Sequence, residues 1–349
     1  MDVTMALLPP FIRGSRTPAS RGARNVAPHT AAGLPADDEV LLDAPDDRLG
    51  PALVAAGRDE YDAAAALLAG TRVRGEWEHR DGYVVRLASF AHARPDWFER
   101  WRADAPRDPD VLLVAAQLAV HRAWRSPART ELLREVSPLV TAAAQAHVPD
   151  PVPWRIALDH ARGARAGHKY FSELWEAAVR RSPHHYGCHV AALRYLAASW
   201  HGATRECFDF ADRAAQDAPE DSLVQALPLQ AAFAYLTDGC GPDVARERLD
   251  AAADRALALS ARLPVSDPWP AEMRNVLAYV LKRLRRLDEA LDQLRQLGPY
   301  ATSFPWDQLS DDPLGHFLAV RDRIRRGAPA APEWAARGDH GGRGPWEDH

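Results

Sequence analysis

The sequence of 349 residues contains almost no lysine and very little cysteine or methionine. Arginine supplies nearly all the positive charge, since Lys169 and Lys282 are the only lysines, and this bias is typical of a GC-rich bacterial genome. The three cysteines, Cys188, Cys207 and Cys240, form no C-x-x-C pair. A disulfide framework and a four-thiolate zinc site are therefore not expected, and a reducing cytoplasm is the natural compartment.

Long apolar runs are also missing. No segment approaches the roughly eighteen residues that a membrane helix needs, and MALLPPFI near the amino terminus is too short and too rich in proline for a signal peptide. The formal net charge is −5, whereas phosphate binding usually needs a basic surface. We therefore expect no membrane partner and do not favour a nucleic-acid partner.

The motifs that indicate phosphate binding or nucleophilic catalysis do not occur. There is no G-x-G-x-x-G, no G-x-x-x-x-G-K-[ST] and no G-x-S-x-G. Cysteine–histidine catalysis would need Cys188 or Cys207 beside His189 or His201, but a cysteine of this kind is more often a small buried side chain. The sequence therefore predicts no cofactor and no catalytic residue.

Two histidines have a spacing that metal sites use. His185 and His189 are four residues apart, which places both imidazoles on one face of a helix. Zinc would need a third ligand, and the H-E-x-x-H pattern is missing. Such a pair beside a turn more often packs or lies at the surface, so we expect no metal and keep His185 and His189 as the only metal candidates.

The sequence does contain a helical hydrophobic period over most of its length. In FSELWEAAVRR the apolar residues fall at i, i+3, i+4, i+7 and i+8: Phe171, Leu174, Trp175, Ala178 and Val179. Residues 271–297 continue the same pattern, which is typical of helices with one buried side. The segment YVVRLASF at 83–90 is ambiguous, and we expect it to be helical like its neighbours. The sequence predicts an all-α fold.

The helices recur at a regular distance. Residues 171–187 align with 207–223 at an offset of 36, so that Phe171 falls on Cys207. A helix, a proline-marked turn and a second helix, repeated every 34 to 40 residues, is typical of a helical solenoid. We expect a solenoid of antiparallel helix pairs over residues 41–326.

The two ends of the chain differ from this domain in composition. Residues 1–40 are rich in Pro, Gly, Ser and Arg and have no helical or strand period, and residues 327–349 are of low complexity. Both compositions predict disordered tails. The first is alternatively a basic tether for nucleic acid or a partner, and Trp334 and Trp346 in the second are candidates for short linear anchors.

The segment SWHGATRECFDFADRAA places Trp200, His201 and Cys207 close together. Gly202 is suited to ending one helix, and the Thr204 hydroxyl is suited to capping the next. Cys207 takes the same position as Phe171 in the repeat, so we expect it to be buried. The segment is interpreted as a joint between two helices.

Residues 174–223 resemble part of uncharacterised actinobacterial proteins that are tetratricopeptide-like and carry a domain of unknown function. The motifs are P-H-x-x-x-x-H, W-x-G and F-x-x-x-A…A-P, represented here by Pro183, His184, His189, Trp200, Gly202, Phe210, Ala214, Ala218 and Pro219. Residues 305–326 resemble the closing segment of such proteins. The resemblance implies a tetratricopeptide-like helical array and implies no established activity.

The predicted function is a non-catalytic scaffold whose groove holds a peptide or helix of another bacterial protein. Aromatic and arginine side chains are the usual anchors of such interfaces. The binding candidates are Trp175, Tyr195, Trp200 and His201.

Two alternatives stay open. One is an enzyme or small-molecule binder with a pocket inside the array, around His185, His189 and Trp200. The other is an accessory transcriptional regulator whose basic arm touches DNA. The oligomeric state and the identity of a partner do not follow from the sequence.

Overall fold

The computed structural model describes residues 33–199, 204–238 and 244–327. Within these ranges the chain is all-helical, with sixteen α-helices, two short 3₁₀ helices and two strands of two residues each. The sequence-based expectation of an all-α fold is therefore confirmed. None of the described helices combines the length and the apolar character needed to cross a membrane.

The elements follow one another as short helices joined by tight connections. In chain order they are η2 (Asp37–Glu39), β1 (Leu41–Leu42), α1 (Leu49–Ala56), α2 (Asp62–Arg74), α3 (Trp77–Ala93), α4 (Asp96–Asp104), α5 (Pro109–Trp124), α6 (Arg129–Ala146), α7 (Val152–Gly163), α8 (His168–Arg181), α9 (Tyr186–Ser199), α10 (Thr204–Asp217), η3 (Leu223–Ala226), α11 (Leu227–Asp238), α12 (Arg246–Ser260), α13 (Ala271–Arg283), α14 (Leu287–Leu297), β2 (Tyr300–Ala301), α15 (Ser303–Trp306) and α16 (Pro313–Arg326).

Local sequence signals account for many of the helix ends. The Asp108 carboxylate accepts hydrogen bonds from the backbone N–H groups of Asp110 and Val111 and so caps α5, whose first donors have no partner within the helix. Gly75 and Gly327 end α2 and α16 with φ of 67° and 61°, a left-handed conformation that glycine adopts without strain. The ambiguous segment YVVRLASF lies inside α3, and its predicted helical conformation is confirmed.

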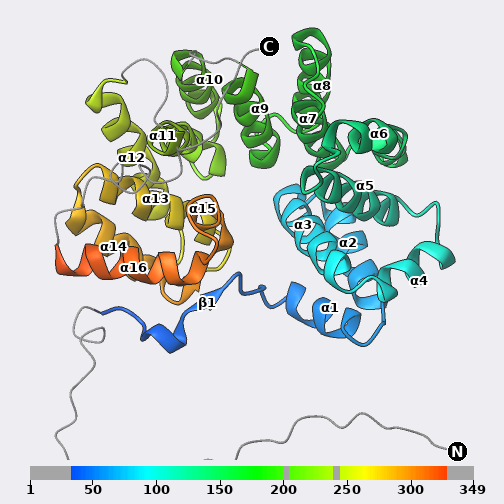
Figure 1. The fold of residues 1–349 in the computed structure, drawn as a ribbon, viewed down its shortest axis with the longest axis horizontal. Coiled ribbons are helices and arrows are strands. Elements are labelled where there is room, and N and C mark those ends of the chain that lie inside the picture. The colour runs from blue at the N-terminus through cyan, green and yellow to red at the C-terminus, as the bar shows by residue number, and fades with distance from the viewer. Residues whose placement is uncertain (1–32, 200–203, 239–243, 328–349) are drawn as a thin grey trace, which may run out of the picture.

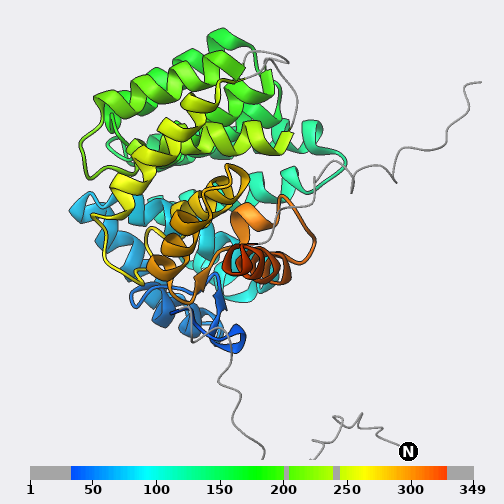
Figure 2. The same cartoon turned by 90° about the vertical axis from the view of Figure 1, so that its left-hand side faces the viewer.

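The helices follow one another around a ring (Figure 1), which Figure 2 shows from the side. Two hydrophobic cores hold this ring together. One core joins the helices from α1 to α9, and the other joins α9 to α16. Leu196 of α9 and Phe210 of α10 pack against both cores, so the α9–α10 region connects the two halves of the molecule.

The first described residues close the ring against its other end. Leu34 and Val40 are buried in the second core, although composition places residues 33–40 in the amino-terminal arm. Strand β1 then pairs in parallel with β2, with Leu41 opposite Tyr300. Because these residues precede α1, the segment joins the start of the helical array to its last helices.

Polar contacts and ring stacking strengthen this closure. The Asp43 carboxylate accepts a hydrogen bond from the backbone N–H of Ser303 at 2.8 Å, and the Arg321 guanidinium donates to the carbonyl of Pro35 at 3.1 Å. The His79 and Trp269 rings stack with their centroids 4.1 Å apart, which joins α3 to the loop before α13. Three separate side-chain contacts therefore hold the two ends of the ring together.

Candidate functional site

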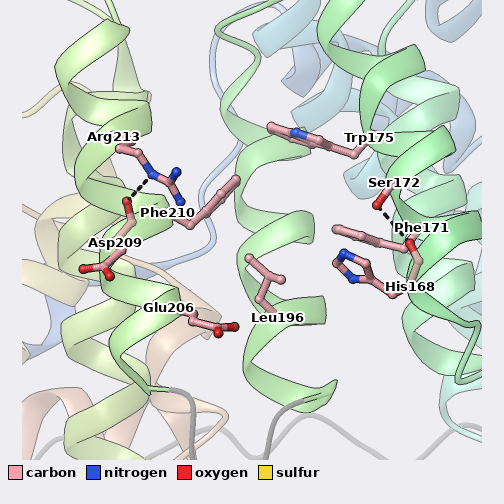
Figure 3. A pocket seen from close by; sticks show the side chains of 9 residues that line it. All are labelled: His168, Phe171, Ser172, Trp175, Leu196, Glu206, Asp209, Phe210 and Arg213. Atoms are coloured by element: carbon pink, nitrogen blue, oxygen red, sulfur yellow. Dashed lines mark hydrogen bonds between the residues drawn. The ribbon is translucent and has the colours of Figure 1, made fainter.

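A groove about 380 Å³ in volume lies between α8 and α10, with α9 as its floor (Figure 3). The residues that line it are His168, Phe171, Ser172, Trp175, Leu196, Glu206, Asp209, Phe210 and Arg213. Its base is apolar, and its rim is polar and charged. Grooves with this distribution of side chains are typical binding sites.

The wall on α8 is fixed by a pair of stacked rings. Phe171 and Tyr195 lie parallel, with their centroids 3.7 Å apart and their planes 4° apart. Both side chains are buried, and the Tyr195 hydroxyl donates to the carbonyl of Ala166 at 2.7 Å. Tyr195, a binding candidate from the sequence, therefore lies behind Phe171 and supports the groove without lining it.

The upper end of the groove is formed by two half-buried aromatic side chains. Trp175 and Phe210 meet edge to face with their ring centroids 5.4 Å apart. His189 lies beneath Trp175 in a second edge-to-face contact at 4.9 Å. Of the binding candidates from the sequence, Trp175 is therefore the one that the structure places in the groove, whereas Trp200 and His201 lie outside the described residues.

His189 is neutral in the folded protein because of its surroundings. Its Nδ1–H donates to the carbonyl of His185 at 3.0 Å, and the rest of the ring packs among apolar groups. Burial lowers the pKa of His189 to about 4, since a low-dielectric environment disfavours the imidazolium ion. The side chain acts here as part of the floor beneath Trp175.

This burial predicts a loss of stability in acid. An unfolded His189 binds a proton near its ordinary pKa of 6.5, whereas the folded side chain resists protonation down to about pH 4. Above about pH 7, His189 is neutral in both states and does not lower the free energy of unfolding. As the pH falls from 6.5 to 4, protonation of the unfolded chain lowers the free energy of unfolding by about 3 kcal/mol. Urea titrations across this range should show a smaller pH slope for His189→Phe than for the native chain. Equal slopes would contradict the prediction.

His185, the other metal candidate, caps the start of α9. Its Nδ1 accepts the backbone N–H of Cys188 at 3.2 Å, which leaves the proton on Nε2, 3.4 Å from the carbonyl of Trp77. The Glu78 carboxylate accepts the backbone N–H of Tyr186 at 2.7 Å. Burial raises the pKa of Glu78 above its ordinary value, and the hydrogen bond from Tyr186 opposes this shift. These groups join α3 to α9.

The arrangement of Cys188, His185 and Asp81 has the residue types of a nucleophilic triad. The His185 Nδ1 lies 3.2 Å from the Cys188 Sγ, and its Nε2 lies 3.8 Å from Asp81. However, Cys188 is buried, its Sγ–H donates to the carbonyl of Pro151, and burial raises the pKa of the thiol well above its usual range. A reactive cysteine needs an exposed, electropositive surrounding. The three residues therefore form a packed joint.

The described ranges contain no group of three or more His, Cys, Asp or Glu side chains placed to hold a metal ion. The rings of His185 and His189 belong to different environments, since one faces α3 and the other faces Trp175. Cys207 is buried in the second core, as its alignment with Phe171 in the sequence predicts.

The packing of Asp81 against the start of α9 requires a glycine at position 187. A Cβ at this position would lie 2.1 Å from Asp81 Oδ2, and Asp81 cannot retreat because its Oδ1 accepts two hydrogen bonds from Arg155. Alanine normally stabilises a helix relative to glycine. Gly187→Ala is instead expected to lower the free energy of unfolding by about 1–3 kcal/mol. The control is Gly50→Ala, because Gly50 is likewise the second residue of its helix, α1, and no atom lies within 4 Å of the new Cβ. A stabilised Gly187→Ala variant would contradict the geometry.

Some charged side chains on the rim of the groove have an ion-pair partner, and others have none among the described residues. Arg248 donates to Asp209 and to Asp212, each at 2.6 Å, and the hydrogen bond from Arg248 holds the pKa of Asp209 below its usual range. Glu206 has no ion-pair partner among the described residues. Within the same ranges, the guanidinium of Arg213 donates only to the backbone carbonyl of Asp209. Glu206 and Arg213 are the two charges on the rim that remain open to a ligand.

The sequence predicted only part of this groove. Phe210 was aligned with Leu174, a core position, yet Phe210 is half-buried and faces Trp175. The signal that could have found it is that α8 and α10 begin and end 36 residues apart, which places two aromatic-bearing helices on either side of α9.

No protein-family model matches the chain, and neither a curated protein nor a solved structure matches it. The function is therefore inferred from the side chains of the groove.

Proposed function

We propose that this chain is a non-catalytic scaffold for protein–protein contacts, whose α8–α10 groove receives a segment of another protein. The observation that carries the proposal is the groove itself, where four apolar side chains from three helices lie inside a charged rim. The apolar residues are Phe171, Trp175, Leu196 and Phe210. Trp175 and Phe210 are half-buried, and aromatic side chains that are partly exposed in a pocket are frequent anchors of protein interfaces.

The same proposal includes a solenoid of antiparallel, tetratricopeptide-like helix pairs. It is supported by the equal lengths of α8 and α10 and by their 36-residue separation. The resemblance to actinobacterial tetratricopeptide-like proteins points the same way. A bacterial cytoplasmic location belongs to this proposal too, and the free, buried thiols of Cys188 and Cys207 are compatible with it.

The test is a pull-down in which the full chain is immobilised and exposed to a lysate of the host bacterium. The double variant Trp175→Ala/Phe210→Ala is expected to lose the specific partner. The matched control is Tyr170→Ala, because Tyr170 is an exposed aromatic residue on α8 that does not line the groove. Circular dichroism checks that both variants fold. A partner that binds the double variant as well as the native chain would exclude the groove as its binding surface.

A further inference from the structure

We infer that the occupant of the α8–α10 groove is an amphipathic helix of a partner protein, bound antiparallel to α8 and α10. This helix has acidic residues toward its amino end and basic residues toward its carboxyl end. The inference rests on the proposed function and specifies the chemistry of the partner.

The shape of the groove suits a helix. Its two walls are helices of 14 residues, and each is therefore about 21 Å long. They run in the same direction, since His168 and Glu206 lie at one end of the groove and Trp175 and Arg213 at the other (Figure 3). The residues that line the groove cover only His168–Trp175 of one wall and Glu206–Arg213 of the other, so a partner helix of two to three turns, about 8–11 residues, spans it.

The apolar side chains of the groove are spaced for the stripe of a helix. Phe171 and Trp175 are one turn apart on α8, and Phe210 faces them from α10 above the floor residue Leu196. Helices that bind in grooves use anchors at i, i+3 or i+4, and i+7. A peptide that binds by strand addition would instead need the open edge of a sheet, and none of the elements that line this groove is a strand.

Charge sets the direction of the partner. Glu206 and Arg213 lie at opposite ends of the groove (Figure 3), and the two aspartates nearby pair with Arg248 and, for Asp209, also with Arg205. The end with Glu206 also holds the amino termini of α8 and α10, whose dipoles favour the carboxyl terminus of an occupant. Basic residues at that terminus meet Glu206, and acidic residues at the other terminus meet Arg213.

The charged contacts set the orientation of the partner helix, whereas the apolar contacts set its affinity. Exposed ion pairs contribute little affinity, so the contacts of Glu206 and Arg213 fix orientation and selectivity. Burial of an apolar stripe against the half-buried Trp175, Leu196 and Phe210 supplies most of the binding energy. A partner with the reverse order of charges should therefore bind, but more weakly or in the opposite direction.

The experiment is selection from a displayed library of random peptides about 16 residues long, with the full chain as bait. We expect enriched peptides with apolar residues at helical spacing, acids in the first half and bases in the second. Their affinity should fall at least about tenfold for Trp175→Ala/Phe210→Ala and stay unchanged for Tyr170→Ala.

A charge-exchanged bait tests the direction without altering the net charge. The variant Glu206→Arg/Arg213→Glu should enrich peptides with the opposite order of acids and bases. Groove-dependent peptides with alternating apolar residues, or with the same charge order on both baits, would overturn the inference and leave the proposed function intact. If no enriched peptide depends on Trp175 and Phe210, the proposed function fails together with it.

Discussion

Replacing Arg80 with methionine is expected to lower the free energy of unfolding by about 3–5 kcal/mol, because it leaves the buried Asp150 carboxylate without a counter-charge and leaves Asp110 with only its longer pair to Arg72 at 3.3 Å. Arg80 on α3 is fully buried. Its guanidinium donates to Asp110 at 2.6 Å, to Asp150 at 2.6 Å and to the carbonyl of Leu68 at 2.9 Å. Asp150 in turn accepts the backbone N–H of Val152 at the start of α7. One side chain thus connects α2, α3, α5 and α7.

Chemical denaturation of the native chain and the variant measures this effect. The control is Arg102→Met, because Arg102 forms an exposed pair with Glu99 on the same α4 turn, and such pairs contribute little. Adding Asp150→Asn to Arg80→Met should recover part of the loss, since the unpaired charge is then removed, whereas Asp110 keeps its pair with Arg72. If Arg80→Met and Arg102→Met cost the same, the buried cluster does not have the role assigned to it.

The helices and their buried faces were predictable, since the spacing of apolar residues along each helix is a local pattern in the sequence. The equal separation of α8 and α10 follows from the same local pattern. The closure of the ring was not predictable in this way. Asp43 accepts a hydrogen bond from Ser303, which lies 260 residues further along the chain, and no local pattern links two such positions.

The candidate site was predictable to a similar degree. The sequence predicts Trp175 as a binding residue, because an aromatic residue on an amphipathic helix is a frequent anchor. In the structure, Trp175 lines the groove. Tyr195 carries the same signal but is buried behind Phe171, since burial depends on which helix packs against it. His185 and Cys188 illustrate the same limit: a spacing of three residues fits both a helix cap and a catalytic pair, and only burial decides between them.

The second large effect is expected for Arg274 on α13. The fully buried guanidinium donates all five of its N–H groups to oxygen atoms of neutral groups, and it has no ion-pair partner among the described residues. The acceptors are the Ser260 Oγ and the carbonyls of Ser260, Leu263, Pro264 and Gln296. Burial lowers the pKa of Arg274, because removal from water disfavours the charged guanidinium.

Arg274→Leu is therefore expected to lower the free energy of unfolding by about 3–5 kcal/mol, because several buried acceptors lose their donor at once. Arg274→Lys should lie between this variant and the native chain, since an ammonium group has three donors in place of five. The control is Arg262→Leu, because Arg262 is exposed on the adjoining turn and pairs with Glu220. A lysine variant as stable as the native chain would show that the number of donors does not matter.

The same substitution tests how the ring is held closed. Gln296, an acceptor of Arg274, lies just before strand β2, and the backbone N–H of Ser266 also donates to its carbonyl at 2.9 Å. The amides of Leu41 and Asp43 donate to Pro299 and Ala301, each at 2.8 Å. Hydrogen exchange at these two amides should therefore accelerate in Arg274→Leu more than at amides inside α5. Equal acceleration at both places would mean that β2 is positioned by the second core alone, and that Arg274 stabilises the fold only globally.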